Sequence, residues 1–177
     1  MKPFGKLENE LIELCHQYPP NLDAIKAKIA EGADVNAYDD DRTVKTSLLA
    51  EVIYNYGWNL SDKNSAEDYN CEYLPAIVTI ILDAGFDVAL DDGRYGAMAL
   101  AHLRFCATDR RILEVAKLLL NAGADPHVAP YEDEPYGSAI EDIRFETQIY
   151  PDETVRNDLL WDLADLLECY PHQRRDL

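Results

Sequence analysis

Leu118-Leu119-Leu120-Asn121-Ala122-Gly123-Ala124-Asp125 is the stretch that decides the fold of this chain. It is an apolar run of helical character that ends in a glycine, after which come a small residue and an aspartate. Glycine adopts the left-handed backbone conformation that closes a helix. An aspartate side chain accepts hydrogen bonds from nearby backbone N–H groups and stabilises a turn. We therefore predict a helix that ends at Gly123 and a turn that is held by Asp125.

The same pattern occurs twice earlier in the chain. Residues 27–36 read AKIAEGADVN and residues 80–89 read IILDAGFDVA, so that Gly32 and Gly85 take the place of Gly123. A short apolar segment follows each glycine, at residues 46–50, 96–101 and 137–140. Each unit thus consists of a helix, a glycine stop, a polar loop and a second helix, which predicts a helical hairpin repeated along the chain.

This unit resembles the ankyrin repeat, which has a period of about 33 residues, two helices and a turn, and a Thr-Pro-Leu-His-x-Ala signature. The match is best at residues 118–125, whereas Thr46-Ser47-Leu48-Leu49 keeps two of the four signature positions and lacks the histidine. The resemblance covers residues 20–145. It implies an all-α solenoid of about four helix-turn-helix repeats, with projecting hairpin loops beside a concave face that grips partners.

The spacing of the glycines exceeds the period of the family. Gly32 and Gly85 are 53 residues apart, and Gly85 and Gly123 are 38 residues apart. The extra residues fall between the two helices of a unit, at the polar segment 57–71 and around residues 107–111, with a third candidate at 147–153. Insertions on one face of a repeat array often mark a binding face. Tolerated growth of surface loops is the alternative, because added loop length costs little.

Apolar periodicity and helix-breaking residues predict eight helices, which pair into four hairpins. The terminal helices 6–18 and 154–170 are expected to cap the stack, since outer repeats are atypical. The predicted helices are Lys6–Tyr18, Leu22–Glu31, Thr43–Tyr56, Tyr73–Ala84, Tyr95–Ala107, Arg111–Ala122, Gly137–Glu146 and Thr154–Tyr170.

The chain has 177 residues, which suits one domain over residues 1–177. Its 34 acidic and 16 basic residues leave a formal net charge of −18. Such a charge repels nucleic-acid phosphates and anionic membranes, and it attracts basic proteins. Residues 1–13 form no secretion signal and the four cysteines are widely spaced, so we expect reduced thiols and a cytoplasmic location. Capped ends favour a monomer.

Residues with catalytic or metal-binding chemistry form no convincing site. His102 and Cys106 lie four residues apart, which is half of a zinc site, but no second ligand pair has matching spacing. His127 occupies a turn position, where a hydrogen-bonding role is expected. The acidic runs 39–41 and 91–92 lack the ligand order of a calcium loop. We therefore expect no catalytic residue, no metal site and no cofactor.

The loops that follow the glycine stops combine acidic and aromatic residues, and we call residues 37–42, 90–95 and 130–136 the first, second and third acidic loops. Tyrosine is enriched at energetic hot spots of interfaces, and carboxylates steer a basic target. A purely solubilising role of the acids is the alternative. The candidate partner-binding residues are Tyr38, Asp39, Asp40, Asp41, Arg42, Asp91, Asp92, Arg94, Tyr95, Tyr131, Glu132, Asp133, Glu134 and Tyr136.

Three functions stay open at this point. The first is a non-enzymatic scaffold that binds a basic protein, with an inhibitor or immunity protein against a cationic toxin as a more specific version. The second is a nucleic-acid mimic that blocks a DNA-binding protein, which would carry its acids in rows along helices. The third is an enzyme, which would need a pocket that holds His102, Cys106 and an acid.

Overall fold

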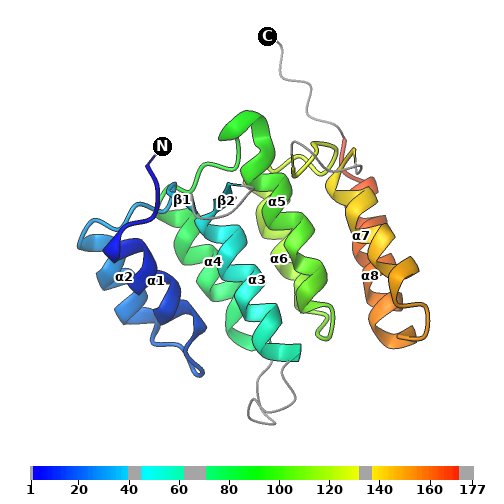
Figure 1. The fold of residues 1–177 in the computed structure, drawn as a ribbon, viewed down its shortest axis with the longest axis horizontal. Helices are drawn as coiled ribbons and strands as arrows, with labels where there is room; N and C mark the ends of the chain where they lie inside the picture. Colours follow the sequence, from blue (N-terminus) through cyan, green and yellow to red (C-terminus); the bar gives the residue numbers. More distant parts are fainter. Residues whose placement is uncertain (1, 40–44, 62–70, 132–136, 172–177) are drawn as a thin grey trace.

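The computed structural model describes residues 2–39, 45–61, 71–131 and 137–171, with residues 58–61 described as backbone only. The described part of the chain is all-α, with eight α-helices and a small two-stranded pairing (Figure 1). The elements are α1 (Lys6–His16), α2 (Leu22–Ala30), β1 (Tyr38–Asp39), β2 (Thr46–Ser47), α3 (Leu48–Ser61), α4 (Leu74–Asp83), α5 (Arg94–His102), α6 (Ile112–Asn121), α7 (Ala139–Ile149) and α8 (Thr154–Glu168). Short 3-10 helices cover Cys71–Tyr73, Asp91–Gly93 and Leu103–Cys106.

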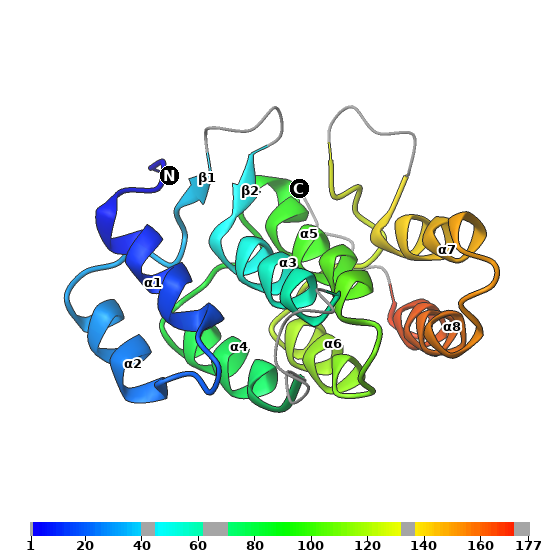
Figure 2. The same cartoon turned by 60° about the horizontal axis from the view of Figure 1, so that its bottom comes forward.

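The helices form antiparallel pairs that stack side by side in two layers (Figures 1 and 2). α1, α3, α5 and α7 contact one another in sequence and form the first layer. α2, α4, α6 and α8 do the same in the second layer. Each pair therefore buries its apolar sides against its own partner helix and against the next pair, while α1–α2 and α7–α8 stand at the two ends.

The three glycine turns have the same hydrogen bonds. In each turn the glycine N–H donates to the carbonyl three residues earlier, and the next N–H donates to the carbonyl five residues earlier. This is the Schellman motif, and Gly32, Gly85 and Gly123 adopt φ values of 107°, 93° and 97°. The aspartate two residues after each glycine accepts the N–H two positions further on, at 2.9 to 3.0 Å. The predicted helix stop and the predicted aspartate turn are confirmed.

Side chains also join one turn to the next element of the stack. Asn36 of the first turn donates from its amide to Gly85 O at 2.9 Å and accepts the N–H of Asp87 at 2.8 Å. His127 of the third turn lies with Nε2 3.0 Å from Tyr170 O, beyond the end of α8. The hydrogen-bonding turn role that was predicted for His127 is confirmed.

The predicted helix Thr43–Tyr56 is wrong at both ends. The helix starts at Leu48, because Thr46 and Ser47 pair with β1 and the Ser47 hydroxyl accepts the N–H of Ala50 at 3.3 Å. The helix then continues through Gly57 to Ser61, into the segment that was predicted to be an inserted loop. Gly57 therefore lies inside a helix and not in a loop. A Cβ atom at this position would lie 2.6 Å from the backbone of Phe105. The glycine permits close packing of α3 against the 3-10 helix that follows α5.

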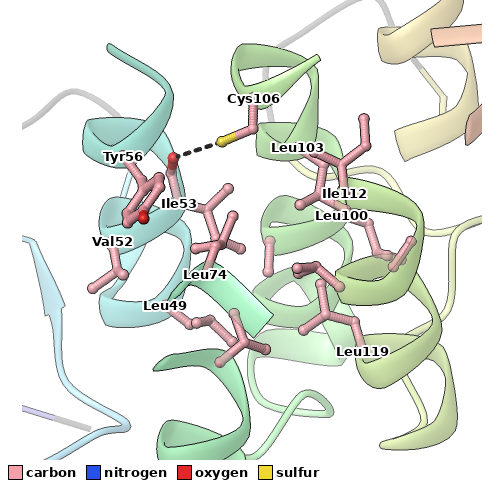
Figure 3. Packing of buried hydrophobic residues seen from close by; sticks show 14 of the residues in the cluster. Leu49, Val52, Ile53, Tyr56, Leu74, Leu100, Leu103, Cys106, Ile112 and Leu119 are labelled. Atoms are coloured by element: carbon pink, nitrogen blue, oxygen red, sulfur yellow. Dashed lines mark hydrogen bonds between the residues drawn. The ribbon is translucent and has the colours of Figure 1, made fainter. Parts of the chain in front are cut away.

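The apolar core is continuous through the middle pairs. Buried side chains from α3 and α4 meet those from α5, α6 and the 3-10 helix Leu103–Cys106 (Figure 3). The labelled members are Leu49, Val52, Ile53, Tyr56, Leu74, Leu100, Leu103, Cys106, Ile112 and Leu119. Because neighbouring pairs share these side chains, no pair could bury its apolar surface alone.

Candidate partner-binding surface

The first acidic loop begins on a small β-structure. Tyr38 pairs with Ser47, and Asp39 pairs with Thr46, in an antiparallel register. The N-terminal segment runs beside this hairpin, since the Tyr38 carbonyl accepts the N–H of Phe4 at 2.8 Å. Lys45 Nζ lies 5.0 Å from the centre of the Tyr38 ring. Asp40, Asp41 and Arg42 lie outside the described residues.

Glu8 of α1 fixes the N-terminal segment and the first turn together. Its buried carboxylate accepts the N–H of Gly5 at 2.8 Å and that of Asp34 at 2.9 Å, and Lys2 Nζ lies 3.0 Å away. Burial opposes ionisation of this carboxyl, but these donors outweigh burial and lower the Glu8 pKa to about 2. The base of the first loop is thus held by an ionised side chain.

The second acidic loop is a tight 3-10 turn rather than a hairpin, which corrects the expectation of a projecting loop here. Asp91 and Asp92 adopt φ values of 54° and 55°, an uncommon conformation for residues with a Cβ atom. Asp92 is exposed, while Asp91 forms an ion pair with Arg94 at 3.3 Å. This loop therefore presents a compact acidic corner at the start of α5.

Tyr95 does not belong to the surface, and this part of the prediction is wrong. Its side chain is only 1% exposed, and its ring stacks on Phe86 with the centroids 6.4 Å apart. Burial, together with the nearby charge of Asp91, raises the Tyr95 pKa to about 12. Tyr95 follows an acidic stretch in the sequence, but it lies in the first turn of the buried helix α5.

The third acidic loop is described only at Tyr131, because Glu132, Asp133, Glu134 and Tyr136 lie outside the described residues. The Tyr131 hydroxyl lies 2.8 Å from Nε2 of the buried His102. His102 Nδ1 in turn lies 2.8 Å from the carbonyl oxygen of Ala50 in α3. One imidazole therefore connects α3, α5 and the base of this loop.

These contacts give His102 a structural role, and Cys106 is equally enclosed. The Cys106 thiol lies 3.5 Å from the carbonyl of Ile53, as drawn in Figure 3. The contact with Cys71 and burial both raise the pKa of Cys106 well above its ordinary value, which disfavours the reactive thiolate. Among the described residues no group of three or more histidines, cysteines or acids could hold a metal ion.

Most of the described basic residues form ion pairs within the protein. Every arginine in the described ranges forms an ion pair with an acidic residue of the same chain. The most buried of these pairs link Arg104 to Asp142, across the junction between the third and fourth helix pairs, and Arg156 of α8 to Glu146 of α7, within the fourth pair. In the described ranges, the excess of acids over bases is therefore not offset by an arginine without an acidic partner.

Sequence reasoning missed an exposed apolar group on the last helix pair. Its five members are Phe145, Ile149, Tyr150, Val155 and Trp161. For Trp161 alone the sequence holds a signal: its three-and-four spacing from Asp158, Asp165 and Glu168 puts it on one helix face with acids, which predicts an exposed position.

In the described part of the chain, no helix combines the length and the apolar character that crossing a membrane requires. Searches against protein-family models, curated proteins and solved structures find no match to this chain.

Proposed function

We propose that this chain is an ankyrin-type repeat protein that binds a basic protein through its acidic loops and the concave face beside them. The observation that carries the proposal is the internal pairing of the arginines in a chain with a net charge of −18. When bases are neutralised internally, the outward potential is dominated by carboxylates. Such a surface attracts cationic partners and speeds their association.

The arrangement of the loops supports this proposal. β1, β2 and the start of α5 lie at one end of the helices, and the described connections α1–α2, α5–α6 and α7–α8 lie at the opposite end (Figure 1). Asp39 belongs to β1, Asp92 lies just before α5, and Tyr131 contacts His102 of the same helix α5. Carboxylates next to a tyrosine combine steering with contact area that costs little side-chain entropy.

A more specific form of the proposal is an inhibitor or immunity protein that neutralises a cationic toxin. It rests on charge and on the small size of a single domain. The role is non-enzymatic and cytoplasmic, and the protein acts as a monomer.

Affinity capture from the lysate of the source cell, read out by quantitative mass spectrometry, tests the proposal. We expect a basic protein, and we expect the combined variant Asp39→Asn, Asp91→Asn and Asp92→Asn to lower its recovery about tenfold. The matched control Asp23→Asn, Asp83→Asn and Glu114→Gln removes as much charge from exposed positions on α2, α4 and α6. It should leave recovery unchanged.

Three outcomes would contradict the proposal: no partner, only acidic partners, or equal loss with both triple variants. If a basic partner is captured equally by all three proteins, binding does not belong to the acidic loops, and the insertion 57–71 is the next surface to test.

The nucleic-acid mimic is the second candidate, and one observation favours it. α8 carries the exposed acids Asp158, Asp162 and Asp165 in a row along a single helix, as a mimic of phosphates would. Competition discriminates the two candidates. A mimic must displace duplex DNA from the captured partner, whereas a partner bound elsewhere would hold both ligands together.

A further inference from the structure

The last helix pair has an outer edge that no other element of the described residues covers. α7 and α8 stand at the end of the stack, and no described element lies beyond them (Figure 2). The large apolar side chains that are exposed in the described residues all belong to this pair and its turn, with exposed fractions from 38% to 82%. Large exposed apolar side chains gathered in one region indicate a binding surface.

One stripe of α8 combines this apolar character with negative charge. Asp158, Trp161, Asp165 and Glu168 are spaced by three and four residues, so they share one face, and we call them the α8 outer stripe. All four are exposed, and Trp161 is 45% exposed. Acids alone would suffice to keep the end of a stack soluble. A half-exposed tryptophan among them does not serve solubility.

A contact within the chain shows how this stripe can hold a cation. The guanidinium of Arg144 in α7 lies 5.9 Å from the centre of the Trp161 ring, and it forms an ion pair with Glu168 at 2.6 Å. The stripe therefore already holds one cation by a ring face and a carboxylate. Asp158 and Asp165 form no ion pair with a described residue, so their charges are open to further cations.

We propose that the α8 outer stripe is a docking surface for a cationic amphipathic segment of a partner protein. Apolar side chains of the segment would cover the exposed part of Trp161. Lysine or arginine side chains would reach Asp158 and Asp165 and lie against the indole ring, as Arg144 does. Cations over tryptophan contribute most when they are desolvated, which a docked segment would achieve.

A second copy of this chain fits the stripe poorly. A symmetric contact would place the same carboxylates opposite one another, and like charges at short range repel. The inference does not rest on the acidic loops, because α8 lies away from β1 and β2 at the end of the stack (Figure 2). The two surfaces can therefore be tested separately.

The test uses a labelled synthetic peptide of about 15 residues, in which leucines recur every three or four positions and the other positions are lysine or arginine. Fluorescence anisotropy with the full chain measures its Kd. We expect Trp161→Gln to raise the Kd about tenfold, and Asp158→Asn with Asp165→Asn to raise it about fivefold. A peptide with glutamate at every basic position should not bind.

A control variant removes the same amount of charge from positions outside the α8 outer stripe. Asp23→Asn with Asp83→Asn, at exposed positions on α2 and α4, should change the Kd by less than about twofold, because distant exposed charges contribute little. The chain has two tryptophans, so Trp58→Phe leaves Trp161 as the single reporter, and its emission should shift on binding. Equal effects of both double variants, or unchanged Trp161 emission, would overturn the proposal.

Further outcomes separate the other possible occupants. A dimer in analytical ultracentrifugation that Trp161→Gln abolishes would assign the stripe to a second copy. A more than about fivefold gain in peptide affinity on deletion of residues 172–177 would show that the tail, with Arg174 and Arg175, occupies it. Loss of peptide binding in the triple variant of the acidic loops would place the peptide there. Each of these results would overturn the proposal.

Discussion

The hydroxyl of Tyr131 lies 2.8 Å from Nε2 of His102, at the base of the third acidic loop. The carbonyl of Ala50 lies 2.8 Å from the other ring nitrogen and can only accept a hydrogen bond, so Nδ1 carries the proton. In the neutral imidazole, Nε2 is then the acceptor and Tyr131 the donor. This buried ring ties the loop to two helices of the first layer.

Tyr131→Phe should lower the free energy of unfolding by about 1 to 2 kcal/mol, because it leaves a buried ring nitrogen without its donor. Chemical denaturation at neutral pH measures the loss. Tyr150→Phe is the matched control, since Tyr150 is exposed and its ring, which lies 5.4 Å from Arg156, is retained. An equal loss in both variants would contradict the assigned hydrogen bond.

Glu8→Gln should cost about 1 to 2 kcal/mol of stability near pH 7, because the carboxylate serves two backbone donors and Lys2. The Glu8 pKa is lowered from 4.5 to about 2, so between these values the unfolded chain binds the proton more readily. The contribution is therefore fully present above pH 4.5 and is lost as the pH falls toward 2. Unfolding at several pH values should show the difference from wild type shrinking in that window.

Glu13→Gln provides the comparison for this experiment, because Glu13 is an exposed carboxylate on the same helix. It should leave stability unchanged across the whole range. If the Glu8→Gln difference were the same at pH 7 and at pH 2.5, the ionised carboxylate would not be the stabilising species.

His16 should make the protein sensitive to mild acid. Burial lowers its pKa from 6.5 to about 4, and a backbone hydrogen bond with Val52 opposes the shift only in part. Between these values the unfolded chain takes up the proton first, so stability falls as the pH drops from 6.5 to 4. The loss should reach about 2 kcal/mol, and His16→Gln should flatten this part of the profile. A midpoint near 6.5 for His16 in an NMR titration would contradict the prediction.

Two glycines should differ in their response to alanine. Gly85→Ala should cost about 1 kcal/mol, because φ is 93° and a Cβ atom there meets no neighbour within 4 Å. Gly57→Ala should cost more, about 2 to 3 kcal/mol, because its Cβ atom would overlap the backbone of Phe105. Thermal unfolding of both variants measures the order, and a reversed order would contradict the close packing of α3 at Gly57.

Local signals in the sequence account for most of the fold. The Gly-x-Asp turns act through bonds between residues a few positions apart, so the stops at Gly32, Gly85 and Gly123 could be predicted together with the helices before them. The start of α3 could not, because Thr46 and Ser47 are held by pairing with β1. A glycine that allows close packing cannot be told from a loop glycine by sequence alone, so the role of Gly57 within α3 could not be predicted.

The candidate surface also has some features that the sequence predicts and others that only the structure shows. The acidic character of the loops is a property of composition, and it is visible in the sequence at Asp39, Asp91 and Asp92. The burial of Tyr95, the bridge through His102 and the exposure of Trp161 are decided by which neighbouring helix is present or absent. Short-range hydrogen bonds depend on residues that are close in sequence, and net charge depends on composition alone. Burial, by contrast, arises only when separate helices pack together. The sequence by itself therefore determined the repeating hairpin and its charge, and the tertiary structure decided which side chains are buried and which are exposed.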